Sequence, residues 1–489
     1  MKSIINKIKE KDNICIFILF FLISLGICLD IFIEANDEIW NFQNVYKMYN
    51  GFKIYEEINV IITPLFFWLT EIIFHIFGAN LFIFRLCHCV LISILSLYTY
   101  KILKKLNVPK SLAIFTISIL IFQEFFGLIR GCFNYNILAL LFCIIGIYFL
   151  IEEKTKNNLI IQAIITILVI LTKQNIGIYY LLGNIIYIIF SKNALKTKIK
   201  EMLKYISIII LGGLIFILYL LMDNNLYNFF SYTFGGILEF ANENIIFDVP
   251  AIIYMIGIIS INIIISIFFI KKEIITQKQK ENIKILLIFS VVLAGACYPI
   301  FNWMHIMIGT YLTIINIVYM IYLLFEDFKE KIKKIVTIIN IIIILAMIGV
   351  SSYSMYNWIS TVTSDEYPYS WEEPFFGGII SKENYEENLK ITQYIQENEK
   401  NVIVCSNKAG LYMIPLKRNN GDFDLPFKGN FGFEGENGLI EKIKKMENTQ
   451  FLISNNEEED IYQESKKVKE YIKNNKQQVG EIGDFYIYE

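Results

Sequence analysis

The chain has 489 residues, of which 55% are hydrophobic and 18% are charged, and its formal net charge is −2. Repeated apolar runs of membrane length exclude an ordinary soluble globular protein, and so small a net charge gives no support for nucleic-acid binding. The composition therefore predicts a polytopic α-helical membrane protein.

Apolar segments close to the length of a bilayer span recur along residues 1–357. A span needs roughly 20 apolar residues, and on this basis we predict about eleven spans. They lie near residues 13–32, 81–100, 111–129, 136–151, 158–172, 175–190, 205–222, 250–270, 284–300, 305–325 and 335–357. The first segment ends without a small-residue cleavage site, so we interpret it as a retained span rather than a signal peptide.

Lysines between the predicted spans indicate how the chain is oriented. The clusters are at residues 2–11, 101–110, 154–156, 192–204, 271–284 and 329–334, and alternation of the spans places all of them on one side. Because positively charged loops are retained in the cytoplasm, this side is predicted to be cytoplasmic. The N-terminus is then inside, and the first outer loop (33–80) and the tail (358–489) lie outside the cell membrane.

The first outer loop opens with two adjacent carboxylates, Asp37 and Glu38. Apolar residues then repeat at helical spacing as far as Gly51, which predicts a short amphipathic helix lying in the membrane interface. These residues are Ile39, Phe42, Tyr46 and Tyr49. Asn36 would be the N-cap of this helix. Acidic residues in a first turn are favoured by the helix dipole whatever the function, so capping is the alternative to a catalytic role.

A second short helix is predicted after Pro64, because proline suits the first turn of a helix. The stretch at 63–71 is shorter than a comfortable span, and a crossing here would move the lysines at 101–110 to the outside. We therefore interpret this helix as juxtamembrane, which leaves Arg85 at the outer start of the next span.

The tail at 358–489 changes to a charged and mixed composition, and it is predicted to form a small extracytoplasmic α/β domain. Strand-like runs occur at 401–405, 450–454 and 484–488, and helix-like runs occur at 382–399, 437–447 and 462–474. The predicted organisation is thus a transmembrane catalytic domain at 1–357 followed by this domain at 358–489.

Three basic residues, Arg85, Arg130 and Lys173, lie at the outer ends of predicted spans, against the positive-inside bias. Such cations suit an anion, and phosphate is the obvious one. The alternatives are snorkelling at the lipid interface and ion pairing with a carboxylate such as Asp37 or Glu38. Polar residues near outer span ends are candidates for substrate binding: Gln174, Asn175, Asn134, Asn136 and His305. For His305, a structural hydrogen bond among interfacial aromatic residues is an equal alternative.

The ordered motifs of the first loop are similar to those of a known superfamily. They are the Asp37-Glu38 pair, the Pro-Leu-x-x-Trp-Leu helix from Pro64 to Leu69, and the Gly-x-x-x-Phe-x-x-Arg-Leu entry from Gly78 to Leu86. Together with an exposed C-terminal domain they resemble the GT-C membrane glycosyltransferases. The closest branch is that of the dolichyl-phosphate-mannose protein mannosyltransferases and aminoarabinose transferases, and the likeness covers residues 10–190.

This resemblance implies an inverting glycosyltransferase, which moves a hexosyl or pentosyl group from a polyprenyl-phosphate carrier to an acceptor at the outer face. By position in the motif, Asp37 would be the general base on the acceptor hydroxyl, with Glu38 as its neighbour. Proton abstraction needs one well-placed base, which a carboxylate can provide. Arg85, Arg130 and Lys173 would bind the donor phosphate.

The sequence departs from these relatives at two places. Asn134 and Asn136 stand where relatives often carry an aspartate after the arginine, so a second acidic group there is doubtful. Ile62-Thr63-Pro64 stands where some relatives carry a Lys-Pro-Pro motif, so the lysine of that motif is absent, and Lys173, Arg130 or Lys53 would have to bind the phosphate instead.

No metal and no cofactor are expected, because the outer loops contain no cysteine cluster and no Asp-x-Asp motif. The expected partners are the polyprenyl-phosphate sugar, membrane lipid and an acceptor that is a protein, a lipid or a wall polymer. Heavy use of Ile, Asn and Lys suggests an AT-rich bacterial genome, which would make undecaprenyl phosphate the carrier. The alternatives are a transporter or flippase for cell-envelope glycolipids and a membrane-anchored binding protein.

Overall fold

The computed structural model describes residues 2–33, 37–130, 132–151, 158–243, 246–273, 275–324, 329–364, 371–424, 429–455 and 465–489. By its contacts the chain divides into two compact units. Unit 1 comprises Met1–Asp30, Leu86–Ile215 and Ile246–Asn357, and unit 2 comprises Ile31–Arg85, Phe216–Ile245 and Trp358–Glu489. Unit 2 thus combines the chain after residue 357 with the first outer loop and residues 216–245.

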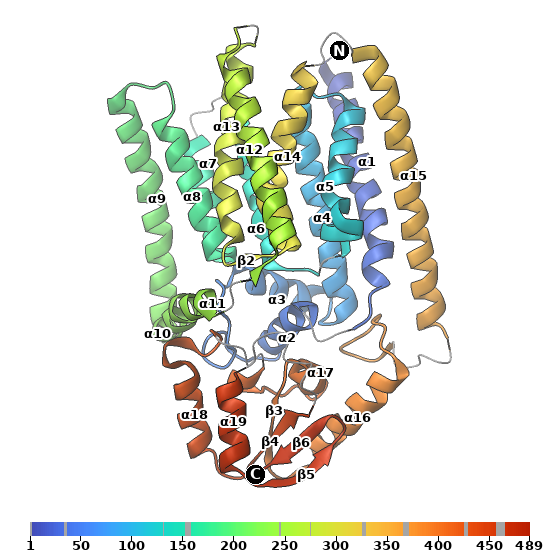
Figure 1. Ribbon diagram of the computed structural model, residues 1–489, viewed down its shortest axis with the longest axis vertical. Coiled ribbons are helices and arrows are strands. Elements are labelled where there is room, and N and C mark those ends of the chain that lie inside the picture. The colour runs from blue at the N-terminus through green and yellow to red at the C-terminus, as the bar shows by residue number, and fades with distance from the viewer. Residues whose placement is uncertain are drawn as a thin grey trace. The chain divides into compact units, whose positions relative to one another are not determined.

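Unit 1 is built from long, roughly parallel or antiparallel helices (Figure 1). They are α1 (Lys2–Leu29), α4 (Leu81–Lys105), α5 (Lys110–Arg130), α6 (Tyr135–Ile151), α7 (Asn158–Thr172), α8 (Gln174–Ile189), α9 (Leu195–Met222), α12 (Val249–Lys271), α13 (Gln277–Ala294), α14 (Trp303–Leu324) and α15 (Lys329–Val362). Each predicted span overlaps one of these helices, although α1 and α9 begin well before the predicted spans at 13–32 and 205–222. Helices α4, α9 and α15 also contribute residues to unit 2.

Local signals explain where the later helices of unit 1 begin. Helix α12 starts after Asp248, whose carboxylate accepts a hydrogen bond from the Ala251 N–H. Helix α13 starts after Thr276, which forms a capping box with Gln279. Both arrangements satisfy backbone donors that a helix leaves unpaired in its first turn.

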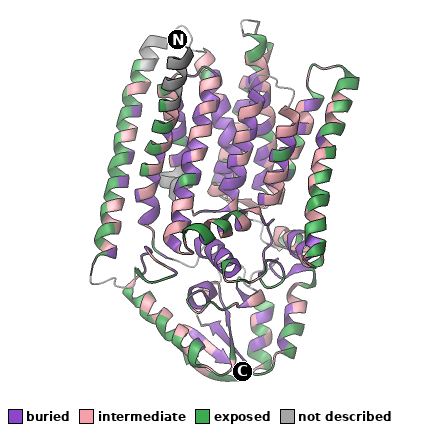
Figure 2. Ribbon diagram, turned by 180° about the vertical axis from the view of Figure 1, so that it is seen from behind, coloured by how far each residue is buried: buried purple, intermediate pink, exposed green. Residues whose placement is uncertain are grey.

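Six of the described helices are long and apolar enough to cross a membrane. The apolar window of α9 is 11% buried and that of α15 is 17% buried, whereas that of α14 is 67% buried. Figure 2 shows the same contrast, with many exposed residues on the peripheral helices and buried ones between them. Apolar surface of this extent is unfavourable in water, so these helices present a lipid-facing surface. The chain is a multi-pass membrane protein.

The C-terminal part of unit 2 is the predicted α/β domain. Its four-stranded sheet has the order β3-β4-β6-β5, with β3 parallel to β4 and the other pairs antiparallel. The strands are β3 (Asn401–Cys405), β4 (Thr449–Ser454), β5 (Gln478–Ile482) and β6 (Phe485–Tyr488), and the helices are α16 (Lys382–Glu397), α17 (Ala409–Met413), α18 (Gly435–Lys445) and α19 (Lys466–Asn475). Three strands and three helices match the predicted runs.

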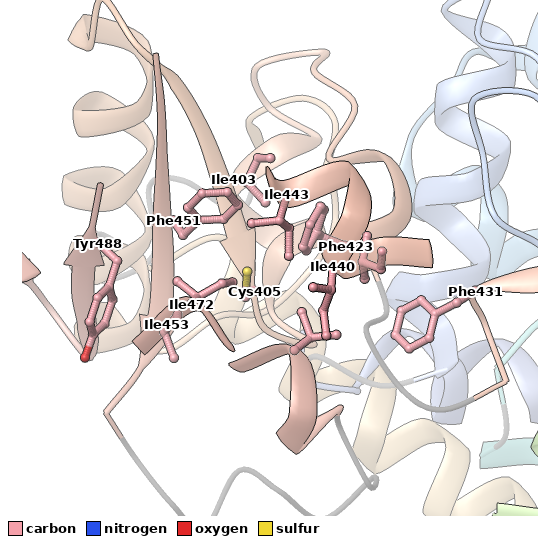
Figure 3. Close-up of a cluster of buried hydrophobic side chains, with 12 residues drawn as sticks. Ile403, Cys405, Phe423, Phe431, Ile440, Ile443, Phe451, Ile453, Ile472 and Tyr488 are labelled. Carbon is pink, nitrogen blue, oxygen red and sulfur yellow. The ribbon is translucent and has the colours of Figure 1, made fainter. Parts of the chain in front are cut away.

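Alternate residues of β3 and β4 form the core of this domain (Figure 3). Ile403 of β3 and Phe451 and Ile453 of β4 pack in one cluster with Ile443 of α18 and Ile472 of α19. Because successive strand residues point to opposite faces, this set fixes which face of the sheet the two helices cover.

The remaining elements of unit 2 come from the first outer loop and from residues 216–245. They are α2 (Asp37–Tyr49), α3 (Leu65–Phe77), α10 (Leu226–Phe230), a π-helical segment (Ser231–Gly236) and α11 (Ile237–Glu243). The Ile33 N–H donates to the Ile379 carbonyl over 2.7 Å, and the Leu81 N–H donates to the Pro374 carbonyl over 2.9 Å. These bonds tie the first loop to the chain after residue 357, at positions far apart in sequence.

Candidate active site

Helix α2 carries the two carboxylates that the sequence singles out. It begins at Asp37 and ends at Tyr49, just before Gly51, which has a positive φ of 96°. The proposed N-cap Asn36 lies outside the described residues. Every residue from Glu38 to Met48 is buried, whereas Asp37 is exposed. The helix is therefore enclosed by protein on all sides along most of its length, whereas the apolar spacing predicted a helix with one apolar face in the membrane interface.

Glu38 and Arg85 form a buried ion pair. The Arg85 Nε–H donates to Glu38 Oε1 over 3.0 Å, and its Nη2–H donates to Glu38 Oε2 over 2.8 Å. Only 2% of Arg85 and 5% of Glu38 are exposed. This two-pronged geometry is the strongest form of a carboxylate–guanidinium contact. Arg85 is therefore paired with a carboxylate, which was one of the alternatives to phosphate binding. As a result the adjacent acids Asp37 and Glu38 have different surroundings.

The apolar face of α2 is anchored by aromatic rings. The ring of Phe42 lies 5.8 Å from that of Phe74 in α3, 5.6 Å from that of Phe84 and 6.3 Å from that of Phe375, measured between centroids. Such pairs contribute packing beyond their buried area, each by about 0.5–1.5 kcal/mol. Helix α2 is thus fixed from the first loop and from the tail at once.

The C-terminal half of α2 is bound to the α/β domain by a buried ion pair between Lys47 and Asp424. The Lys47 ammonium donates to the carboxylate of Asp424, and it also donates to Asn419 Oδ1 over 3.1 Å. Burial lowers the pKa of Lys47 to about 7, and a neighbouring carboxylate favours the charged form. One turn earlier, a Cβ on Gly410 would lie 2.1 Å from Gln43 Oε1, so α17 and α2 are in close contact.

Two asparagines that sequence reasoning missed lie on the same stripe of α2 as Asp37. Asn41 and Asn44 follow Asp37 at helical spacing, and each is 1% exposed. Within the described residues, Asn41 Oδ1 and Asn44 Nδ2 are buried without a hydrogen-bond partner. Buried amide atoms of this kind are costly unless a partner arrives. The sequence signal was present, since both residues are polar positions in an otherwise apolar pattern.

A second polar group forms within unit 1, around the turn between α7 and α8. Lys173, which is 8% exposed, precedes α8 in an extended conformation, and its ammonium donates to Asn136 Oδ1 near the start of α6. The same nitrogen lies 5.1 Å from the centroid of the Tyr135 ring. The sequence named Lys173 and Asn136 as separate candidates, and the structure brings their side chains into contact.

The other predicted site residues of unit 1 make hydrogen bonds of different kinds. Asn134 caps α6, because its Oδ1 accepts from the N–H groups of Asn136 (2.9 Å) and Ile137 (3.1 Å). Asn175 Nδ2 donates to the Ala296 carbonyl over 3.2 Å. His305 Nδ1 lies 2.8 Å from Asn302 Oδ1.

Gln174 begins α8 directly after Lys173, and Arg130 ends α5, although the side chain of Arg130 lies outside the described residues. The predicted residues therefore form two groups, with Asp37, Glu38 and Arg85 in unit 2 and those around Lys173 in unit 1. Among the residues that the structure describes, no group of three or more His, Cys, Asp or Glu side chains is placed to hold a metal ion.

Comparisons with known proteins agree with this architecture. Residues 62–222 match the family described as dolichyl-phosphate-mannose-protein mannosyltransferase. The crystal structure of apo ArnT from Cupriavidus metallidurans is similar to the chain with a TM-score of 0.55 and 10% identity, covering 98% of each chain. The same protein bound to undecaprenyl phosphate gives a TM-score of 0.56 and 10% identity, covering 97% of each chain. No curated protein matches the sequence. The resemblance to the GT-C fold is confirmed.

Proposed function

From this GT-C fold, we propose that the chain is an inverting membrane glycosyltransferase that takes its sugar from a polyprenyl-phosphate donor at the outer face. The observation that carries the proposal is the difference in environment between the two adjacent carboxylates of Asp37 and Glu38. Glu38 is buried and bound by Arg85, whereas Asp37 is exposed at the start of a helix fixed along the rest of its length. A base on a rigid support is what proton abstraction requires.

In this reaction the oxygen of the acceptor hydroxyl bonds to the anomeric carbon of the sugar, and Asp37 takes the hydroxyl proton. The bond between that carbon and the phosphate oxygen breaks, and its electron pair stays with polyprenyl phosphate as the leaving group. Lys173 stabilises the charge that develops on this phosphate, because an ammonium group is a strong partner for phosphate oxygens. The solved ArnT structure with undecaprenyl phosphate supports a donor of this class.

The surroundings of Arg85 favour a positioning role instead of phosphate binding. Two of its nitrogens donate to Glu38 and its side chain is 2% exposed. We assign it to holding the first turn of α2, next to Asp37. Lys173 is then the first candidate for the donor phosphate, and Asn41 and Asn44 are candidates for hydrogen bonds to the sugar or the acceptor.

The test is turnover of a panel of labelled polyprenyl-phosphate sugars by the purified protein and by its Asp37→Asn variant. We expect the variant to lose about 100-fold or more in turnover, since general bases contribute roughly 10²–10⁴-fold. The matched control is Glu383→Gln, which removes an exposed acid from the first turn of α16. That control tests the capping alternative, and a loss as large as that of Asp37→Asn would refute the role of Asp37 as base.

The same assay separates the enzyme from a transporter or flippase. A transporter moves the lipid-linked sugar intact, so it would leave the label on the lipid, whereas a glycosyltransferase releases the label to water or to an acceptor. Absence of release by the wild-type protein with every donor, together with movement of the intact lipid across proteoliposomes, would favour the transport alternative.

A further inference from the structure

A cavity lies in unit 1, at the ends of α6 and α8 and the start of α13. Its volume is about 320 Å³. The end of α6 supplies Leu150 and Ile151, and the end of α8 and the following turn supply Tyr187, Phe190, Ser191 and Lys192. The first half of α13 supplies Lys278, Glu281, Asn282, Lys284, Ile285 and Ile288. In Figure 1 the turn from α8 to α9 and the start of α13 lie at the same end of the helices. The lysine distribution predicts that this end is cytoplasmic.

The charge around this cavity is positive. Lys192, Lys278 and Lys284 line it, and among the described residues Glu281 supplies the one carboxylate of the lining. The hydroxyl oxygen of Ser191, also in the lining, is buried without a hydrogen-bond partner among the described residues. Three ammonium groups and an unpaired hydroxyl together form a site that suits the oxygens of a phosphate ester.

The walls of the cavity are apolar, and they continue toward lipid. Leu150 and Ile285 are buried in the wall, with 8% and 4% of their surface exposed, whereas Phe190 at the end of α8 is 71% exposed. A site for a soluble anion would have no use for an apolar wall that leads to an exposed aromatic ring on a membrane helix. A lipid has both parts, because its charged headgroup is joined to an apolar chain.

We propose that this cavity binds the phosphate headgroup of an anionic phospholipid, with the acyl chain against Phe190. Basic cavities between membrane helices on the cytoplasmic side are suited to such headgroups, and each lysine near the headgroup contributes about fivefold in affinity. Neither Lys173 nor Asp37 lines this cavity, and the proposal does not rest on the proposed transferase activity.

The test measures binding of short-chain phosphatidylglycerol to the purified full-length protein in a neutral detergent. Replacing Lys192, Lys278 and Lys284 together with glutamine is expected to weaken this binding by about 100-fold. The matched control replaces Lys196, Lys200 and Lys204 of α9, which removes the same charge from exposed positions outside the cavity lining. The control is expected to bind as the wild type does. Equal weakening by both triple variants would overturn the proposal.

Two further measurements test whether the bound phosphate belongs to a lipid and whether a loss of binding is caused by misfolding. Inorganic phosphate and phosphatidylcholine are expected to bind at least about tenfold more weakly than phosphatidylglycerol, and equal binding of either would overturn the lipid assignment. Ser191→Trp fills the cavity without changing any charge, and it is expected to abolish binding while the elution profile and melting temperature stay those of the wild type. Undiminished binding by this folded variant would overturn the site.

Discussion

The pairing of Glu38 with Arg85 decides how two neighbouring acids are used. Removing one partner of a buried ion pair leaves the other charge without compensation, which costs about 3–5 kcal/mol. We therefore expect Arg85→Gln and Glu38→Gln each to lower the stability of the protein in detergent, and the double variant to recover part of the loss. The measurement is unfolding of the four proteins of this double-mutant cycle.

The cycle also separates a positioning role from phosphate binding. A positioning role for Arg85 requires a coupling energy with Glu38 and a fall in kcat, because the base moves with the first turn of α2. If Arg85→Gln leaves stability unchanged and raises only the KM for the donor, Arg85 binds the phosphate and our assignment is wrong.

Lys173 is the residue for which we predict a direct effect on donor binding. Hydrogen bonds to charged groups contribute about 1.5–3 kcal/mol, so Lys173→Met is expected to raise the KM for the polyprenyl-phosphate donor by about tenfold or more. The matched control is Lys382→Met, since the Lys382 side chain is 75% exposed and its ammonium lies 3.9 Å from the Glu386 carboxylate. Equal donor KM values for the two variants would contradict the prediction.

The sequence was enough to identify candidate residues by their chemistry, but it was not enough to predict which of them contact each other. The outer cations and the Asp37-Glu38 motif were identifiable because charged groups are rare among long apolar runs. The contact of Glu38 with Arg85 was one alternative among several, since nothing local fixes a contact across 47 positions. The unpaired amide atoms of Asn41 and Asn44 depend on tertiary burial, which a helical periodicity does not specify.

Helix α2 is held as a whole element by its contact with the C-terminal domain. The buried pair between Lys47 and Asp424 is the polar part of this contact. We predict that Asp424→Ala lowers kcat by about tenfold with little change in the KM for the donor, because an α2 that moves by a fraction of a helical turn misplaces Asp37. The measurement is steady-state kinetics with a saturating acceptor.

Two further variants serve as controls for the predicted effect of Asp424→Ala on kcat. Lys442→Met disrupts another lysine–aspartate pair of the same domain, but one whose lysine side chain is 51% exposed, so its effect is expected to be small. The exchange of Lys47 with Asp424 restores opposite charges and is expected to regain part of kcat. An exchange variant no better than Asp424→Ala would show that packing, and not charge pairing, holds the helix.

At the scale of elements, the sequence predicted the helices well because bilayer length and apolar composition constrain them strongly. Strand β5 was missed for a physical reason. It is an edge strand with a register shift between Gln478 and Gly480, and its residues are mostly exposed, so it lacks the alternation that marks a half-buried strand. The juxtamembrane helix after Pro64 was predicted, and α3 begins at Leu65.

The whole molecule is organised differently from a linear reading of the chain. Unit 2 is assembled from three separate stretches, 31–85, 216–245 and 358–489. Apolar periodicity locates elements but carries no information on which distant stretches pack together. The Asn225 Nδ2–H bond to the Ile54 carbonyl at 2.6 Å and the Phe433 N–H bond to Ser231 Oγ at 2.8 Å are examples of contacts between these stretches.

This assembly predicts that the tail is needed for catalysis although it contributes none of the proposed catalytic groups. A chain ending at Asn357 loses Phe375, Gly410 and Asp424, each of which contacts α2. We expect this truncated chain to remain a monodisperse membrane protein, since the apolar helices of unit 1 satisfy their own backbone groups. Its turnover is expected to be lost, because α2 is no longer fixed.

Limited proteolysis reports on α2 directly and independently of activity. In the full chain the Lys47 side chain is 3% exposed and lies within a buried helix, so trypsin is expected to spare the bond after it. Cleavage there should appear in the truncated chain, while cleavage after the already exposed Lys53 should occur in both proteins. A truncated chain that keeps wild-type turnover and protects Lys47 would mean that the membrane helices alone position the proposed base.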